Sequence, residues 1–148
     1  MEFLSKSPDK TRKIGTRFVK GLSAKTCLIG LTGDLGSGKT TFVQGMAQGL
    51  GIDPRHYVTS PTFTIINEYG RAVQEPPLLV HVDLYRIEKP SEGETLAIDE
   101  YLERSNIVVV EWIERLPDLE KKMDFQVRFE MISGKERKIK IEELSCTT

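Results

Sequence analysis

The sequence GDLGSGKT at residues 33–40 decides the fold, because it matches the phosphate-binding loop pattern G-x-x-x-x-G-K-[ST] at every fixed position. The apolar run at 26–31, immediately before it, is typical of a buried strand. After it, apolar residues recur at helical spacing from 43 to 50, and Gly51 is placed to end that helix. Strand, glycine loop and helix in this order predict an α/β fold with a nucleotide bound where the strand turns into the helix.

The residue types in this loop suit a triphosphate. Glycines let the backbone curl so that consecutive N–H groups point at phosphate oxygens, with the positive end of the helix dipole behind them. Lys39 adds a charge for the β- and γ-phosphates, and the Thr40 hydroxyl is a ligand for Mg²⁺. The competing interpretation is a glycine-rich turn that only starts a helix. Because all four fixed positions match and both flanks are as required, we favour the nucleotide site.

Length and charge restrict the class of protein. The chain has 148 residues, a formal net charge of −1 and a pI near 6.2. We therefore expect a single domain over residues 1–148, with a flexible tail at 144–148, that does not coat nucleic acid by charge alone. The sequence has no run of eighteen apolar residues and no signal-like start, so we expect a cytoplasmic protein that does not enter the membrane. Two cysteines and two histidines are too few for a disulfide framework or a metal cluster.

The rest of the chain alternates predicted helices and strands. Ser7-Pro8 is typical of a helix start, and Ser91 with Glu94 resembles a capping box before a helix that runs through Leu102. The remaining elements are strands, at 78–84, at 107–110 and in a C-terminal hairpin of 125–132 and 137–141. This pattern predicts a P-loop NTPase-like three-layer sandwich, with a mostly parallel central sheet, helices on both faces and a C-terminal antiparallel hairpin.

Two carboxylates stand where a nucleotide site needs them. Glu111 ends the apolar run 107–110, and Asp83 ends the strand predicted before it. In nucleotide-binding α/β folds, a carboxylate at the carboxyl end of a strand near the loop reaches Mg²⁺, directly or through water. The alternative for each is a strand-end carboxylate that caps a loop or pairs with Arg86 or Arg115. We predict that both belong to the nucleotide site, and the spacing leaves open which binds metal and which orients the water.

The segment 59–64 has more hydroxyls than an ordinary core strand, at Thr59, Ser60, Thr62 and Thr64. It follows the loop helix, where switch segments sense the γ-phosphate through a hydroxyl and Mg²⁺. An edge strand rich in β-branched threonine explains the same composition equally well. Both interpretations stay open from the sequence.

Four motifs together resemble the TsaE family, the ATPase component of the bacterial machinery that makes threonylcarbamoyladenosine (t⁶A) in tRNA. They are GDLGSGKTT at 33–41, SPTFT at 60–64, HVDLYR at 81–86 and VEW at 110–112. The loop is shared by many proteins, whereas the H-x-D-L-Y-R and V-E-W elements are much more specific. The resemblance implies a small ATPase that uses ATP and Mg²⁺ and joins the TsaB and TsaD proteins. It would serve t⁶A formation at position 37 of tRNAs that read codons beginning with adenine, with tRNA reached indirectly through the complex.

The resemblance also implies roles for individual residues. They are Gly36, Ser37, Gly38, Lys39, Thr40 and Thr41 for the phosphates, Thr40 and Glu111 for Mg²⁺, Lys39, Asp83 and Glu111 for hydrolysis, and Thr59, Ser60, Thr62 and Thr64 for the switch. The base would lie between Pro8 and Thr11 near the N-terminus and Gly134 in the hairpin turn. That turn reads Gly-Lys-Glu-Arg here, which departs from the family's more usual Gly-Arg.

Two other classes of protein share the loop. A small P-loop kinase of a nucleoside or another small molecule needs an acceptor pocket and usually an arginine-rich lid, for which 148 residues leave little room. A GTPase-like switch normally carries an N-K-x-D motif that reads guanine and a D-x-x-G after the second strand. Neither occurs at the expected place, since Asp83 is followed by Leu84-Tyr85-Arg86. We therefore expect ATP rather than GTP, and hydrolysis rather than transfer to a small acceptor.

Overall fold

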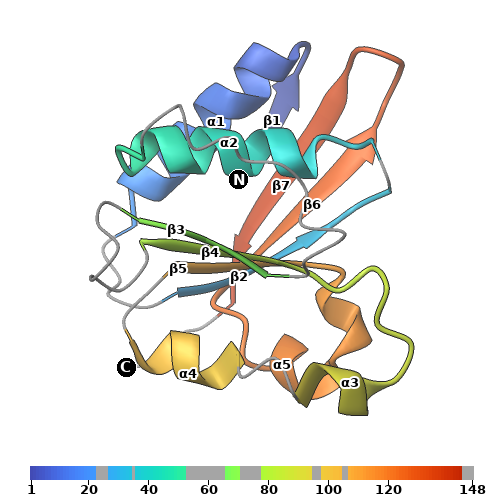
Figure 1. The fold of residues 1–148 in the computed structure, drawn as a ribbon. Helices are drawn as coiled ribbons and strands as arrows, with labels where there is room; N and C mark the ends of the chain where they lie inside the picture. The colour runs from blue at the N-terminus through green and yellow to red at the C-terminus, as the bar shows by residue number, and fades with distance from the viewer. Residues whose placement is uncertain are drawn as a thin grey trace.

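The computed structural model describes residues 1–22, 27–34, 36–52, 66–70, 78–94, 98–104 and 107–144, and every strand in these ranges belongs to one sheet (Figure 1). The strand order is β1-β7-β6-β2-β5-β4-β3. β6, β2, β5 and β4 run parallel to one another, whereas β1, β7 and β3 are antiparallel to their neighbours. The strands are β1 (Glu2–Ser5), β2 (Cys27–Thr32), β3 (Ile66–Tyr69), β4 (Leu79–Asp83), β5 (Ile107–Glu111), β6 (Phe125–Met131) and β7 (Arg137–Glu143). The predicted parallel centre and C-terminal hairpin are confirmed.

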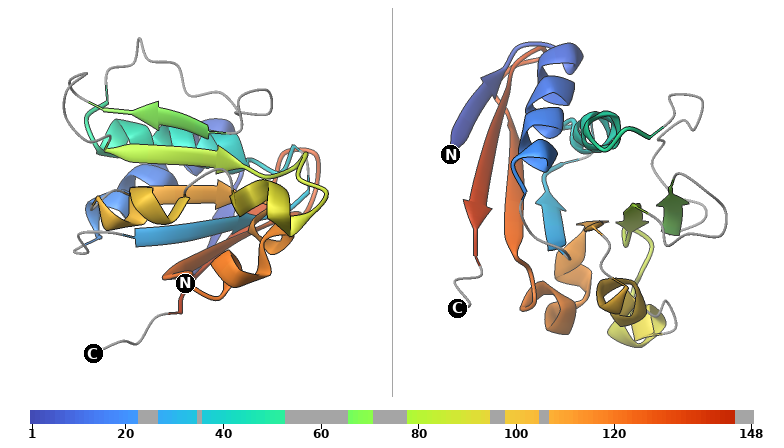
Figure 2. Two further views of the ribbon diagram at one scale, coloured as in Figure 1. Left: turned by 60° about the horizontal axis from the view of Figure 1, so that its bottom comes forward. Right: turned by 90° about the vertical axis from the view of Figure 1, so that its left-hand side faces the viewer.

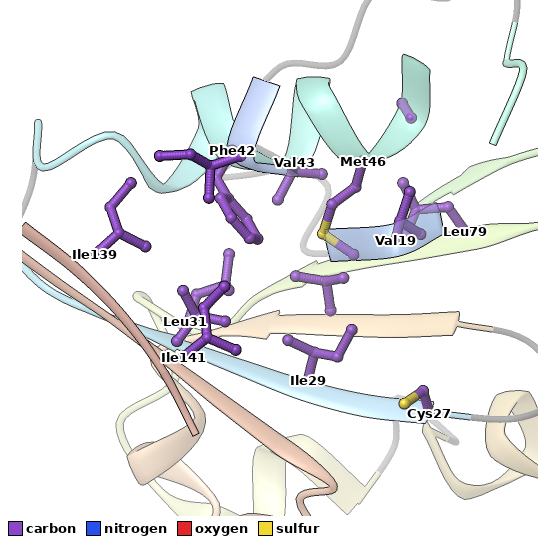
Figure 3. Packing of buried hydrophobic residues seen from close by; sticks show 14 of the residues in the cluster. Val19, Cys27, Ile29, Leu31, Phe42, Val43, Met46, Leu79, Ile139 and Ile141 are labelled. Atoms are coloured by element: carbon purple, nitrogen blue, oxygen red, sulfur yellow. The ribbon is translucent and has the colours of Figure 1, made fainter. Parts of the chain in front are cut away.

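Helices cover both faces of the sheet, which confirms the predicted three layers (Figure 1, Figure 2). α1 and α2 lie on one face, and α3, α4, α5 and the short 3-10 helix η1 lie on the other. Figure 3 shows Phe42 and Met46 of α2 packed over Ile29 and Leu31 of β2. The helices are α1 (Pro8–Lys20), α2 (Lys39–Gly49), α3 (Pro90–Glu94), α4 (Ile98–Glu103), η1 (Ile113–Arg115) and α5 (Pro117–Glu120). In the described ranges, none of these helices has the length and apolar character needed to cross a membrane.

Alternation along the buried strands sends neighbouring side chains to opposite cores. In β5, Val109 packs toward α1 and α2, while the residues on either side of it pack toward α3, α4 and α5. Glu111, two residues further on, shares the face of Val109. In β4, Leu79 packs toward α2, so His81 and Asp83 lie on that face as well. The polar strand residues therefore lie on the side of the sheet that carries the glycine loop.

α1 and α2 pack closely because glycines face the opposite backbone. A Cβ atom at Gly45 would lie 2.7 Å from Cα of Arg12 and nearer still to its carbonyl oxygen. A Cβ atom at Gly15 would overlap the carbonyl oxygen of Phe42. The Thr16 hydroxyl donates to Gly45 O at 2.7 Å across the same contact. This packing fixes α1 beside the helix that begins at the loop.

The predicted start of α1 and the predicted end of α2 are confirmed. Ser7 caps α1, since its hydroxyl accepts the Lys10 N–H at 3.1 Å, and Pro8 occupies the first turn. Gly51 follows the last turn of α2 with a left-handed φ of 76°, and its N–H donates to Gln48 O at 3.1 Å. Glycine is favoured at this position because a Cβ atom strains the left-handed backbone.

The predicted capping box at Ser91 is wrong. α3 begins at Pro90, so Ser91 lies inside the first turn and is not the cap. Proline is favoured at the first helical position because its fixed φ suits the helix and it lacks an N–H that would otherwise need a partner. The helix predicted through Leu102 is α4, which begins at Ile98, and residues 95–97 lie outside the described residues.

The two ends of the chain add contacts that the sequence did not predict. β1 joins the edge of the sheet by pairing with β7, from Glu2 opposite Lys140 to Ser5 opposite Arg137. Leu144, expected in the tail, donates its N–H to the carbonyl oxygen of residue 124 at 2.8 Å. Residues 145–148 lie outside the described residues.

Cys27 is a buried thiol at the start of β2. Burial, with a further contribution from the carboxylates of Asp124 and Glu143, raises the pKa of this thiol to about 12. The thiol therefore stays protonated and unreactive near neutral pH, which agrees with a packing role.

Candidate functional site

The glycine loop connects the carboxyl end of β2 to the first turn of α2. Gly36 and Gly38 have left-handed φ angles of 78° and 103°. Gly38 is the N-cap of α2, so the cap residue itself has no side chain to cover the amides of the first turn. Among the described residues, a Cβ atom added at Gly36 would meet nothing within 4 Å, so none of them fills the space beside the loop there. Uncapped amides at a helix N-terminus are the donors that a phosphate group requires.

Lys39 is the first residue of α2, and only 5% of it is exposed. Its ammonium group donates to Gly33 O at 2.7 Å and lies 4.0 Å from Glu111 Oε1. The indole of Trp112 covers it, with 4.4 Å between Lys39 Nζ and the ring centroid. An ammonium group has three N–H donors, and the Gly33 carbonyl takes one of them. The positive charge is therefore held at the loop rather than in solvent.

Parallel pairing brings both predicted carboxylates to the loop end of the sheet. Glu111 lies opposite Leu31 of β2 on one side and opposite Asp83 of β4 on the other. Both carboxylate residues are nearly buried, with 3% of Glu111 and 4% of Asp83 exposed. Glu111 Oε2 lies 2.6 Å from His81 Nε2, and Asp83 Oδ1 accepts the Tyr85 N–H at 2.9 Å. Glu111 and Asp83 are therefore neighbours that are held by different partners.

The alternatives predicted for these carboxylates have different outcomes. Asp83 does cap the turn that follows its strand. Glu111 contacts the loop lysine and His81, whereas Arg115 donates to Ile87 O at 3.4 Å. A carboxylate has two oxygens with several lone pairs, so capping a turn through Oδ1 does not exclude a role at the nucleotide for Asp83.

The Trp112 side chain packs against Lys39 of the glycine loop. Its backbone is left-handed, with φ 62° and ψ 38°, which is uncommon for a residue with a large side chain. Its ring lies 5.2 Å from the ring of Tyr85, and the Arg115 guanidinium lies 5.6 Å from its centroid. The turn immediately after Glu111 thus directs the indole onto Lys39. Because the sequence contains one tryptophan, its fluorescence reports on the loop.

A pocket of about 480 Å³ opens beside the loop and gathers the residues predicted to hold the base. Pro8 and Thr11 from the first turn of α1 face Gly134 from the β6–β7 turn across it. The lining residues are Lys6, Ser7, Pro8, Thr11, Gly36, Gly38, Thr41, Gly134, Lys135 and Arg137. Three of these described lining residues are cationic and none is acidic, so the pocket favours an anionic ligand.

Arg137 is a site residue that the sequence did not single out. Its guanidinium donates to Gly36 O at 3.3 Å and to Ser133 O at 3.0 Å, which ties the hairpin turn to the loop. Arg137 and Gly36 are 101 positions apart. The only signal in the sequence was the unusual Gly-Lys-Glu-Arg order at this turn.

The loop residues fit Mg²⁺ held jointly with a nucleotide. Thr40 lies in the first turn of α2 next to Lys39, and Glu111 reaches that lysine from β5. Hydroxyl and carboxylate oxygens are ligands that Mg²⁺ prefers. Within the described residues, no group of three or more His, Cys, Asp or Glu side chains could hold a metal ion. Two protein oxygens are sufficient where phosphates and water supply the remaining ligands of Mg²⁺.

The remaining predicted site residues are placed as follows. Ser37 is buried, its N–H donates to Asp34 O at 3.1 Å, and its hydroxyl has no hydrogen-bond partner among the described residues. Thr41 lines the pocket. The switch-like segment 59–64 lies outside the described residues.

Comparisons with known proteins agree on one family. The family model described as "Threonylcarbamoyl adenosine biosynthesis protein TsaE" matches residues 5–139. The tRNA threonylcarbamoyladenosine biosynthesis protein TsaE of Bacillus subtilis is 37% identical over 133 residues, which cover 90% of this chain and 79% of that protein. The protein of the same name from Aquifex aeolicus is 33% identical over 140 residues, 95% of this chain and 94% of that protein. The crystal structure of Bacillus subtilis YdiB is similar with a TM-score of 0.71 and 29% identity, covering 98% of this chain and 86% of that one.

Proposed function

The chain belongs to the TsaE family, and from this premise we propose that it is the ATP-binding and ATP-hydrolysing component of t⁶A formation at adenosine 37 of tRNAs that read codons beginning with adenine. One observation carries the nucleotide part of the proposal. The buried Lys39 ammonium is bound to Gly33 O at 2.7 Å and flanked by the strand-end carboxylate of Glu111 at 4.0 Å. A lysine and a carboxylate arranged in this way at an uncapped helix N-terminus support binding of Mg²⁺ and a triphosphate.

The residues of the loop would hold the ATP phosphates. Backbone amides of residues 36–41 would donate to phosphate oxygens, and Lys39 would bind the β- and γ-phosphates as a point charge. Thr40 and Glu111 would hold Mg²⁺, which supplies charge neutralisation at the phosphates. The adenine would lie in the pocket between Pro8, Thr11 and Gly134, whose walls come from α1 and the β6–β7 turn.

We assign the orientation of the attacking water to Asp83. Glu111 Oε2 lies 2.6 Å from His81 Nε2, and its Oε1 faces Lys39, where the proposed Mg²⁺ would use it as a ligand. Asp83 lies beside Glu111 in the strand register, and the hydrogen bond from the Tyr85 N–H to Oδ1 helps to fix its side chain. A carboxylate fixed in this way next to the metal ligand suits a residue that accepts a hydrogen bond from the nucleophile.

The proposed partners are TsaB and TsaD, and the chain would reach tRNA through that complex. The net charge of −1 supports an indirect route to tRNA, since charge alone would not hold a polyanion. We expect slow hydrolysis by the isolated chain and faster hydrolysis with both partners present, because arginines supplied in trans commonly raise P-loop turnover.

Hydrolysis with and without partners tests this proposal. The purified chain with ATP and MgCl₂ should form ADP with no added acceptor, and the addition of TsaB and TsaD should raise the rate. TsaB and TsaD should also co-purify with the chain in an ATP-dependent manner. ADP formation that strictly requires a small hydroxylic acceptor would favour a kinase. Preferential binding of GTP in a competition with ATP would favour a GTPase-like switch. No association with TsaB or TsaD in either nucleotide state would remove the partner assignment.

A further inference from the structure

His81 is a buried polar ring at a position where the fold needs only an apolar one. It lies in the middle of β4, is 0% exposed, and has Leu79 on the same face and Val109 opposite in the register. An aliphatic side chain would fill this place as those two neighbours do. A buried imidazole is unfavourable unless a partner satisfies it, and its hydrogen-bond partner is Glu111. The choice of histidine here therefore concerns Glu111 rather than the core.

Two contacts fix the direction of the Glu111 carboxylate. His81 Nε2 holds Oε2 from within β4 at 2.6 Å, and Lys39 faces Oε1 from α2 at 4.0 Å. A glutamate side chain has three rotatable bonds, so its carboxylate takes many directions unless partners select one. Lys39 is itself a ligand of phosphate in the proposed function, so its contact changes when nucleotide binds. His81 is the contact that persists.

The hydrogen bond between His81 and Glu111 also has a direction. Glu111 as a carboxylate only accepts, so His81 Nε2 must donate. His81 Nδ1 is buried and has no hydrogen-bond partner among the described residues. The ring is therefore a fixed donor to Glu111 through Nε2.

We infer that His81 is a positioning residue that holds the Glu111 carboxylate in the rotamer that presents Oε1 to Mg²⁺ at the glycine loop. This rests on the proposed function, because that function makes Glu111 a ligand of Mg²⁺. Residues that hydrogen-bond a metal ligand from behind typically change metal affinity or activity about 10- to 100-fold when they are replaced.

Three substitutions separate hydrogen bonding from packing at this position. In His81→Gln, the amide nitrogen extends as far as Nε2 and still donates to Glu111. In His81→Asn, the amide is too short to reach, and in His81→Leu the donor is absent. The readout is the Mg²⁺ concentration at half-maximal change of Trp112 fluorescence with saturating ATP, which measures binding and not turnover. We expect this Mg²⁺ concentration to increase about 10-fold in His81→Asn and His81→Leu, and less than about 3-fold in His81→Gln.

The same variants in a Glu111→Gln background complete the test. If His81 acts through Glu111, replacing His81 by Asn in this background causes no further shift of the Mg²⁺ midpoint. ATP affinity without Mg²⁺ should be equal in the wild type and the folded His81 single variants, because the loop makes the phosphate contacts. An unchanged Mg²⁺ midpoint in His81→Asn, equal midpoints for Gln and Asn, or an equal shift in both backgrounds would overturn the inference.

The outcomes separate this inference from the proposed function. If the wild-type chain shows no Mg²⁺-dependent response to ATP, the proposed function fails and the inference fails with it. If the wild type responds and the His81 variants respond identically, only the positioning role fails. If His81→Leu does not fold, the comparison of the Gln and Asn variants, which are both polar, still decides the question.

Discussion

Replacing Gly45 by alanine should destabilise the protein even though alanine is the better helix former. A Cβ atom at Gly45 would lie 2.7 Å from Cα of Arg12, whereas ordinary van der Waals contact begins at 3.4 Å. The atoms it meets belong to the backbone of α1, so no side-chain rotation relieves the overlap and α1 must move away from α2. The substitution therefore sets helix propensity against close packing.

The cost of overpacking at Gly45 is larger than the gain in helix propensity. Overpacking costs about 1–3 kcal/mol, and the upper part of that range applies because the obstacle is backbone. Displacing α1 also stretches the hydrogen bond from the Thr16 hydroxyl to Gly45 O, which contributes about 1 kcal/mol. The gain in helix propensity from glycine to alanine is about 1 kcal/mol. The net loss is about 2–3 kcal/mol, equivalent to a fall in Tm of roughly 4–12 °C for a chain of this size.

Thermal and urea unfolding followed by circular dichroism measure this loss. Gly21→Ala is the matched control, because an added Cβ there would lie 3.6 Å from the nearest carbonyl oxygens and φ is an ordinary −83°. We expect the control to change stability by less than about 0.5 kcal/mol. ATP affinity should also fall in Gly45→Ala, because α1 carries Pro8 and Thr11 to the pocket. A Gly45→Ala variant as stable as the wild type, or more stable, would refute the close contact between the two helices.

Three further predictions concern the loop, the hairpin turn and the buried thiol. Lys39→Met should weaken ATP binding about 100-fold in a tryptophan-fluorescence titration, because charge-assisted hydrogen bonds to phosphate are lost. The control Lys20→Met, at an exposed position of α1, should leave ATP affinity unchanged. Equal effects of the two substitutions would contradict the role of Lys39. Arg137→Ala removes the donor to Gly36 O at 3.3 Å and should weaken ATP binding about 5-fold with little change in Tm. Unchanged ATP affinity would show that this hydrogen bond is not needed for binding. Because burial raises the pKa of Cys27 from 9.0 to about 12, its contribution to stability is complete below pH 9 and is lost as the pH rises toward 12. Urea unfolding between pH 8 and 11 should therefore show a steeper loss for the wild type than for Cys27→Val, and identical slopes would argue against this burial effect.

Features that depend on neighbouring residues in the sequence were predictable. The loop motif, the helix start at Ser7-Pro8 and the helix end at Gly51 each need only a few consecutive residues, and the structure has all three. The failure at Ser91 shows the limit of such local signals. Ser91 with Glu94 satisfies one rule for a helix start, but Pro90 satisfies another, and the helix begins at the proline.

Features that depend on strand pairing were only partly predictable. Glu111 and Asp83 were identified because each ends an apolar run, and such runs are typical of the buried parallel strands at the centre of a sheet. Their positions on adjacent strands follow from the register of β4 and β5, which the sequence does not specify. His81 stood in the quoted motif without an assigned role, because its contact with Glu111 crosses between strands.

The sequence by itself determined that a glycine-rich phosphate-binding loop lies between a strand and a helix, because the glycines, the lysine and the threonine of the motif stand within eight consecutive residues. Only the tertiary structure decided what surrounds that site. The strand order sets Glu111 beside the loop and His81 behind Glu111, and the hairpin carries Arg137 to Gly36 across 101 positions. The physical reason is that local conformation depends on short-range sterics and hydrogen bonds. Contacts between distant segments depend instead on which apolar faces pack together and in which register.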